Sequence, residues 1–296
     1  MRKIVFISAL IIALQVNIAA LAQNNKVTLR VPDFVRPLVD KWVAEYQKTN
    51  GQSDFQFVSG GKSQDNNSII FTNTEDAIPF ARYAVLPVTT SESEALQLIG
   101  QHRLNAKKLK SIFFVKDEFD EEDEGSKKKE GPLHVYTGNT IQSASNTYAA
   151  YFKQEKANYK GKKIVGDDSF LTTAISRDPL GVTVNSLPNI FDLNSRHVRQ
   201  GLALLPLEVD KHGRQTLDEG NLDNIIALLE QQQFAEIPIG NIGVSYDKNN
   251  ESQRRFVRWI LENGVNYVHE FGLLQLSQKE LAISLRLTDN NQLAQK

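Results

Sequence analysis

The chain has 296 residues, 41% of them hydrophobic, and a formal net charge of −1 at pH 7. A charge so close to zero gives no global attraction to nucleic acid or to an anionic membrane surface. The sequence contains no cysteine, which excludes disulfides, thiol catalysis and a lipid-modified amino-terminal cysteine.

The first 22 residues have the pattern of a secretory signal peptide. Basic residues precede an apolar run over 4–14, and the small-x-small sequence at 20–22 fits a cleavage site. The apolar run is too short to span a bilayer, because Gln15 and Asn17 interrupt it. We therefore expect a mature chain that starts at residue 23 and is exported to a bacterial periplasm.

Strand and helix patterns alternate along the mature chain. Strand patterns occupy 26–31, 54–58, 82–88, 133–138, 162–166, 180–187 and 241–246. Helical spacing of apolar residues occupies 36–50, 93–104, 143–155, 167–178, 222–234 and 251–264. This alternation predicts an α/β fold with mainly parallel sheets.

The segment 116–132 carries blocks of acidic and basic residues, with glycine and proline near its end. Such runs usually stay solvated, so this composition predicts a charged surface loop. A charged docking site is the alternative interpretation.

A glycine-rich stretch, "QFVSGGKSQ" at 56–64, follows a predicted strand. A phosphate-binding P-loop would need glycine where Gln56 stands, so we do not predict nucleotide binding. Ser59 and Lys62 match the S-x-x-K pattern of serine hydrolases, but the accompanying S-D-N and K-T-G strings are missing. Backbone amides beside a hydroxyl and an ammonium group can also form an anion site.

A second junction of the same character lies within 135–152, where a strand pattern runs into a helical one. It contains Thr137, Gly138, Thr140, Ser143, Ser145 and Thr147. These hydroxyls could simply cap a helix, or they could surround an anion together with the first cluster.

Other chemistry finds little support in the sequence. The five histidines lack the spacing of metal ligands, and no closely spaced carboxylate pair lies in an apolar frame. The pair Asp167 and Asp168 is interpreted as the N-cap of the helix predicted to follow it. We expect no metal, no cofactor and no enzymatic activity.

The order of these elements resembles the periplasmic phosphate-binding protein family, the substrate-binding component of ABC phosphate importers with the type 2 periplasmic binding fold. The resemblance covers nearly the whole mature chain. Its segments are "VTLRVPDFVRPLVDKWVAEYQ", "VSGGKSQDNN", "RYAVLPVT", "YTGNTIQSASNTYAAYF", "GDDSFLTTAISRDPLGVTVNSL" and "NIGVSYDKNNESQRRFVRWILENGVNYVHEFGLLQL".

The resemblance implies two α/β lobes, each a mainly parallel sheet flanked by helices, joined by a hinge and closing on an anion. Lobe 1 would comprise 23–88 with 236–296, and lobe 2 would comprise 89–235. The implied ligand-binding residues are Asp33, Phe34, Gly61, Lys62, Ser63, Thr137, Ser143, Ala144, Ser145 and Thr147. The chain departs from the family at four points. The first turn, Val31-Pro32-Asp33, is bulky and acidic where the family has small residues, and only Asp76, a poor candidate, is available as the family's acidic ligand residue. Thr137 lies where the family usually has an arginine, and Ala144 replaces the glycine of the Ser-Gly-Thr turn.

The predicted function is therefore an exported solute-binding protein that captures a small anion, phosphate foremost, for an ABC importer permease. We expect a monomer that binds no nucleic acid. Two alternatives stay open. One is a sensor or envelope protein on the same fold with an altered pocket, and the other is a serine hydrolase that uses Ser59 and Lys62.

Overall fold

The computed structural model describes residues 26–51, 53–58, 67–100, 102–115 and 133–289. Strands lie in the order β2-β1-β3-β9-β4-β7-β5-β6, with β8 also paired to β4. Their bounds are β1 Lys26–Arg30, β2 Asp54–Val58, β3 Ser68–Thr72, β4 Ile78–Thr90, β5 His134–Gly138, β6 Lys162–Ile164, β7 Gly181–Ser186, β8 Leu202–Leu204 and β9 Ile239–Ser245.

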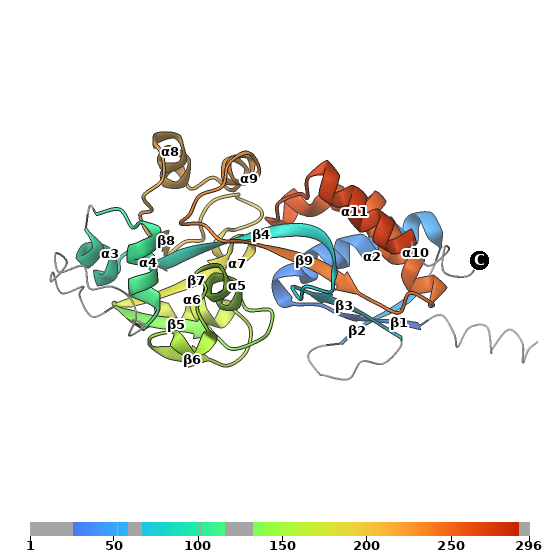
Figure 1. Cartoon of the computed structure of the whole chain (residues 1–296), viewed down its shortest axis with the longest axis horizontal. Coiled ribbons are helices and arrows are strands. Elements are labelled where there is room, and N and C mark those ends of the chain that lie inside the picture. Colours follow the sequence, from blue (N-terminus) through green and yellow to red (C-terminus); the bar gives the residue numbers. More distant parts are fainter. Residues whose placement is uncertain (1–25, 52, 59–66, 101, 116–132, 290–296) are drawn as a thin grey trace, which may run out of the picture.

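The long strand β4 connects the two halves of the molecule (Figure 1). Its first part pairs with β9, and its second part pairs with β7 from Val85 to Val88. β1 is parallel to β2 and β3 on one side, and β5 is parallel to β6 and β7 on the other. The predicted parallel pairing is thus present in both halves, while β4 and β9 run antiparallel to the strands they pair with.

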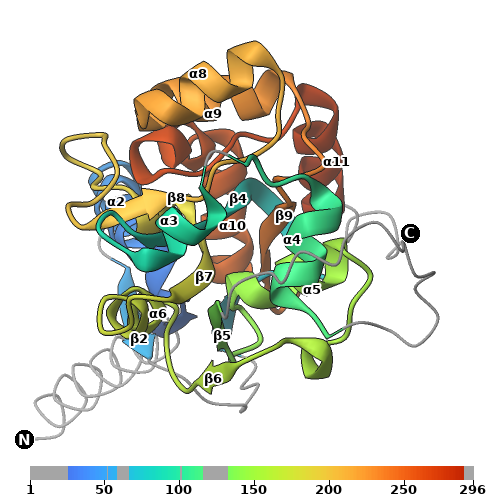
Figure 2. The same ribbon diagram turned by 90° about the vertical axis from the view of Figure 1, so that its left-hand side faces the viewer.

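Helices flank both halves of the sheet, and α8 and α9 lie side by side (Figures 1 and 2). The α-helices are α2 Arg36–Asn50, α3 Glu94–Ile99, α4 Ala106–Phe113, α5 Ala144–Tyr151, α6 Ser169–Ile175, α7 Leu187–Ile190, α8 Lys211–Glu219, α9 Leu222–Gln231, α10 Glu251–Glu262 and α11 Gln278–Asp289. The 3-10 helices are η1 Asp33–Val35, η2 Lys156–Asn158 and η3 Gly264–Phe271.

The core of the first half forms around α2, as its apolar spacing predicts. Its buried residues recur every three or four positions: Leu38, Val39, Trp42 and Tyr46. The Trp42 ring packs edge-on against Phe80 at 4.9 Å, and its indole N–H donates to the Gly264 carbonyl at 2.7 Å. The polar N–H group of this buried indole therefore has a hydrogen-bond partner.

The second half has its own aromatic core, which holds α4 and α5 together. Phe113 and Phe114 of the α4 end contact Tyr148 at centroid distances of 5.2 and 6.2 Å. Tyr159 lies 4.4 Å from Phe114, and its hydroxyl donates to the Ser145 carbonyl at 2.7 Å. This aromatic cluster holds α5 in place next to β5.

Several sequence predictions need correction. The helix predicted over 93–104 ends at Ile99, because Gly100 adopts φ 61° and stops it. The sequence analysis did not predict the helices α4, α7, α8 and α11 or the strands β3 and β8. The capping prediction for the pair Asp167 and Asp168 is confirmed only in part: Asp167 Oδ1 accepts from the Ser169 amide at 2.7 Å, whereas Asp168 stands at the N-cap position of α6 without a cap bond from its side chain.

Other sequence predictions are not decided by the structure. The signal peptide and the charged loop 116–132 lie outside the described residues. The predicted lobe limits, 23–88 with 236–296 and 89–235, stay a prediction.

Candidate functional site

The two halves meet at Tyr83, a residue of β4 that is 1% exposed. Its hydroxyl accepts a hydrogen bond from Asn73 Nδ2 at 3.0 Å and shares another with the Thr147 hydroxyl of α5. The Phe34 ring lies 5.4 Å from the Tyr83 ring. Phe34 and Thr147, predicted on opposite lobes of the site, therefore come together at one side chain. Burial raises the pKa of Tyr83, so its hydroxyl stays protonated and can both donate and accept.

Small hydroxyl residues close the junction between β5 and α5. Ser143 is the N-cap of α5, is 1% exposed and accepts from the Ser145 amide at 3.2 Å. Ser145 is fully buried, and its Oγ accepts from the Gly138 amide at 3.0 Å. Both predicted site serines therefore lie at the helix start and bond to backbone amides next to it.

A carboxylate also lies against this helix start. Asp168 is 7% exposed, and its Oδ2 accepts from the Ala144 amide at 2.6 Å. Its Oδ1 is buried and has no hydrogen-bond partner among the described residues. Burial raises the pKa of Asp168 to about 6, although the nearby Ser143 hydroxyl and the Ala144 amide stabilise its charged form and oppose the rise. Asp168 is thus mainly ionised at neutral pH and occupies the amino-terminal end of α5.

Gly138 makes this close approach possible. A Cβ at position 138 would lie 2.2 Å from Ser143 Oγ and 2.4 Å from Asp168 Oδ1, so no larger residue fits without displacement. The loops that carry these groups are neighbours because β5 and β6 are parallel, with Gly138 opposite Ile164. The loops that follow the carboxyl ends of β5 and β6 therefore place Ser143 and Asp168 next to each other.

The other predicted site residues are placed as follows. Asp33 is exposed in η1, and its pKa is raised by burial and by the nearby charge of Asp167. The start of η1 therefore lies close to the loop between β6 and α6, which carries Asp167. Thr137 is 2% exposed within β5, opposite Lys163. The glycine-loop residues lie outside the described residues: Ser59, Gly61, Lys62 and Ser63.

Sequence reasoning missed two members of this cluster, Tyr83 and Asp168. Tyr83 was included in a strand pattern as a buried residue, and nothing in that pattern marks its hydroxyl as a bridge. Asp168 was recognised as polar and close to a helix start, but its carboxylate bonds to α5, and only its main-chain carbonyl bonds to the helix that follows it. The sequence contained one signal for this contact. Asp168 directly follows Asp167, and since Asp167 already caps α6, the Asp168 carboxylate is available for a contact with another element.

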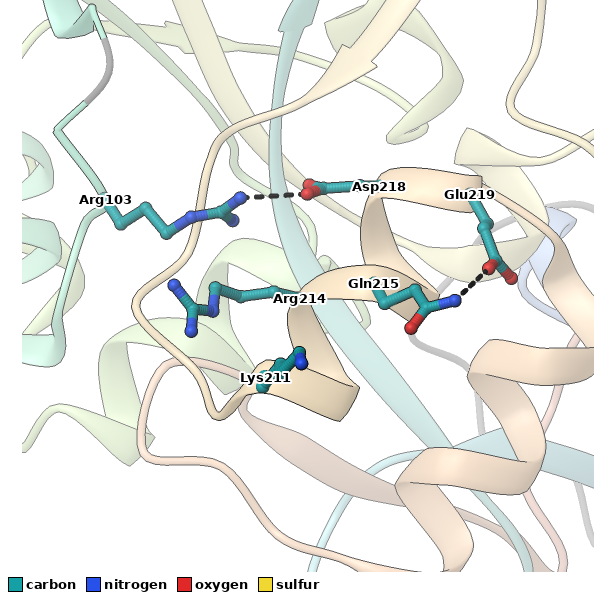
Figure 3. A pocket seen from close by; sticks show the side chains of 6 residues that line it. All are labelled: Arg103, Lys211, Arg214, Gln215, Asp218 and Glu219. Atoms are coloured by element: carbon teal, nitrogen blue, oxygen red, sulfur yellow. Dashed lines mark hydrogen bonds and ion pairs between the residues drawn. The ribbon is translucent and has the colours of Figure 1, made fainter.

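A separate hollow of about 630 Å³ lies between α8 and the segment before α4 (Figure 3). It is lined by Arg103, Lys211, Arg214, Gln215, Asp218 and Glu219. Arg103 pairs with Asp218 at 2.8 Å, and Gln215 donates to Glu219 at 3.1 Å. These contacts are typical of a solvated protein surface, where such pairs contribute little to the stability of the fold.

Within the described ranges, no three His, Asp or Glu side chains gather in a way that could hold a metal ion. None of the helices in that part of the chain is both long and apolar enough to cross a membrane.

Comparison with known proteins identifies the fold. No protein-family model and no curated protein matches the sequence. Among solved structures, one from Clostridium perfringens is named as a phosphate ABC transporter substrate-binding protein with bound phosphate. It is 12% identical with a TM-score of 0.58, and the match covers 86% of this chain and 100% of that one. The chain has the two-lobed fold of substrate-binding proteins.

An ABC-type phosphate transport receptor from Vibrio cholerae is also similar, at 12% identity and a TM-score of 0.51. That match covers 84% of this chain and 100% of the receptor. The resemblance found in the sequence is thereby confirmed for the fold. At this identity it carries no information about the ligand.

Proposed function

We propose that this protein is an exported solute-binding protein that captures a small oxyanion, phosphate foremost, between its two lobes and passes it to an ABC importer. The observation that carries the proposal is the occupied amino-terminal end of α5. There the Ala144 amide donates to an anionic group, the Asp168 carboxylate, at 2.6 Å beside the buried Ser143. A helix start that holds a carboxylate has the donors and the dipole direction that an oxyanion requires.

The fold supports a binding role for this position. β4 runs between the halves, pairing with β9 in its first part and with β7 in its second, so a hinge within β4 could move one lobe against the other. The α5 start lies where the halves meet, because Thr147 contacts Tyr83 and Tyr83 contacts Phe34. Charge-assisted hydrogen bonds contribute about 1.5–3 kcal/mol each, so a few of them suffice for micromolar binding.

Calorimetric titration of the purified protein with phosphate, sulfate and molybdate tests the proposal. We expect saturable heat with at least one anion. Ser143→Ala should weaken binding about fivefold, equivalent to about 1 kcal/mol. Ser176→Ala is a matched control, because this exposed serine at the far end of α6 donates only to the Thr173 carbonyl, at 2.8 Å. The absence of heat with every anion would refute anion capture.

Export and delivery are parts of the same proposal. The signal-peptide pattern of residues 1–22 supports export, and the transport proteins that share the fold support a permease partner. Amino-terminal sequencing of the protein from periplasmic extract should begin at Gln23. Co-purification with a permease should require the anion-bound form.

A second candidate function is favoured by one observation. Asp168 and the contacts among Phe34, Tyr83 and Thr147 already fill the positions predicted for a ligand. A sensor or envelope protein with an altered pocket would have this appearance. It would give no calorimetric response to any of the three anions, whereas the transport protein would.

A further inference from the structure

The amides at the start of α5 are all engaged within the protein. The Ala144 amide donates to Asp168 Oδ2 at 2.6 Å. The Ser145 amide donates to Ser143 Oγ at 3.2 Å, and the Asn146 amide to the Ser143 carbonyl at 3.0 Å. An external anion therefore finds no free donor here unless one of these acceptors leaves.

Asp168 is the acceptor that can leave most easily. The two acceptors on Ser143 belong to the helix cap itself: one is a main-chain carbonyl fixed by the helix, and loss of the other, the hydroxyl, would destabilise the first turn of α5. The main chain of Asp168 is held separately, because its carbonyl accepts from Asn185 Nδ2 at 2.8 Å. Rotation of the side chain alone would free the Ala144 amide and leave both helices in place.

The carboxylate is also poorly satisfied where it lies. Asp168 is more than nine-tenths buried, and Oδ1 has no hydrogen-bond partner among the described residues. Leaving a buried charged oxygen without a partner costs free energy. Its position is therefore one from which an incoming oxyanion, with more acceptor oxygens, could displace it.

We propose that Asp168 acts as an internal competitor for the anion site: its carboxylate occupies the amino-terminal end of α5, and an oxyanion binds there only when Asp168 is displaced or protonated. This inference rests on the proposed anion-binding function and adds its regulation. The competition means that Asp168 lowers the affinity for the anion, so removal of the Asp168 carboxylate should raise that affinity.

Protonation offers a direct way to relieve the competition. Burial raises the pKa of Asp168 to about 6, so about 1% of the group is protonated at pH 8 and about 90% at pH 5. If only the protonated form admits an anion, apparent affinity should rise by tens of fold between these pH values. Sulfate is the suitable probe, because it keeps its charge over this range.

The ionisable groups that face Asp168 come from several elements. They are Asp167 in its own loop, Lys156 in η2, Tyr159 just after η2 and Tyr83 in β4. Asp33 faces Asp167 from η1, and its own pKa is raised. Since Asp33 or Asp167 could add to a pH dependence, the contribution of Asp168 must be isolated by substitution.

The experiment compares sulfate binding by wild type, Asp168→Asn and Asp167→Asn at pH 5 and pH 8. We expect Asp168→Asn to bind sulfate at least tenfold more tightly than wild type at pH 8 and with little change at pH 5. Asp167→Asn removes the same charge and can still cap α6, because an asparagine oxygen can accept from the Ser169 amide. It should follow the wild-type profile within threefold.

Each outcome decides between the two proposals. If wild type binds sulfate and Asp168→Asn binds no more tightly, the competition is wrong while anion binding stands. If neither protein binds sulfate, phosphate or molybdate at either pH, both proposals fall. Should Asp168→Asn not fold, the wild-type profile decides, since equal sulfate affinity at pH 5 and pH 8 would contradict the competition.

Discussion

The raised pKa of Asp168 predicts an unusual pH dependence of stability. In the folded protein the pKa is about 6, whereas an unperturbed aspartate has a pKa of 3.8. This difference corresponds to about 3 kcal/mol of free energy, at about 1.4 kcal/mol for each tenfold change in the acid dissociation constant. Because the folded pKa is raised, the folded state binds the proton more tightly than the unfolded state does. Stability from this group is therefore gained as the pH falls through 6 towards 4.

The perturbation that tests this reasoning is Asp168→Asn, which removes the charge and keeps the shape. At pH 8 the variant should be more stable than wild type, by up to about 3 kcal/mol, because it no longer buries a carboxylate. The amide oxygen of asparagine can still accept from the Ala144 amide, but without a charge it is a weaker acceptor that an oxyanion can displace. The advantage should shrink as the pH falls and should vanish near pH 4.

The measurement is urea unfolding of both proteins at intervals from pH 8 to pH 4. Taking the difference between them removes the contribution of carboxyls whose pKa is lowered, such as Asp178 and Glu280, since those destabilise both proteins equally on acidification. Asp167→Asn is the control for a general loss of charge. A difference that does not depend on pH, or one in which wild type is the more stable protein at pH 8, would refute the reasoning.

Three further substitutions test the packing around the site, each by urea unfolding. Gly138→Ala should destabilise the protein by about 1–3 kcal/mol, since its Cβ would collide with Ser143 and Asp168. Gly201→Ala has nothing within 4 Å of its Cβ but adopts φ 83°, so its cost measures backbone strain without a collision. Tyr83→Phe should cost about 1–3 kcal/mol, because it removes the hydroxyl that joins the two halves while keeping the ring. Ser145→Ala should cost about 1–3 kcal/mol by leaving a buried amide without an acceptor, and a neutral result would contradict that bond.

The fold could be predicted wherever a segment carries its own periodic signal. α2 shows its buried face in Leu38, Val39, Trp42 and Tyr46, and the structure confirms it. α8 could not be recognised in this way, because its nine residues contain one large apolar side chain, Leu217, and a buried Gly213. Its helix depends on capping by Asp210 and on packing against α9, which a local pattern does not reveal.

The candidate site could be predicted only in part, for a related reason. The hydroxyl residues of the β5–α5 junction indicated a candidate site in the sequence, and Ser143 does cap α5. The role of Asp168 depends on the parallel pairing of β5 with β6, which brings together loops 24 residues apart at the Ala144 contact. Such a contact follows from the sheet and not from either segment, so the sequence alone suggested the wrong helix for this carboxylate.

Affinity at this site must be the difference between two sets of bonds. An oxyanion that takes the Ala144 amide gains a bond of about 1.5–3 kcal/mol, but the same amide gives up a bond of the same kind to Asp168. The exchange alone is nearly neutral, so net affinity has to come from groups that are not already satisfied. The sequence predicts Lys62 and Ser63 of the glycine loop at 59–63 as further ligand-binding residues. Lys62→Ala should therefore abolish anion binding more completely than Ser143→Ala in the same calorimetric titration, and equal effects would contradict this division of roles.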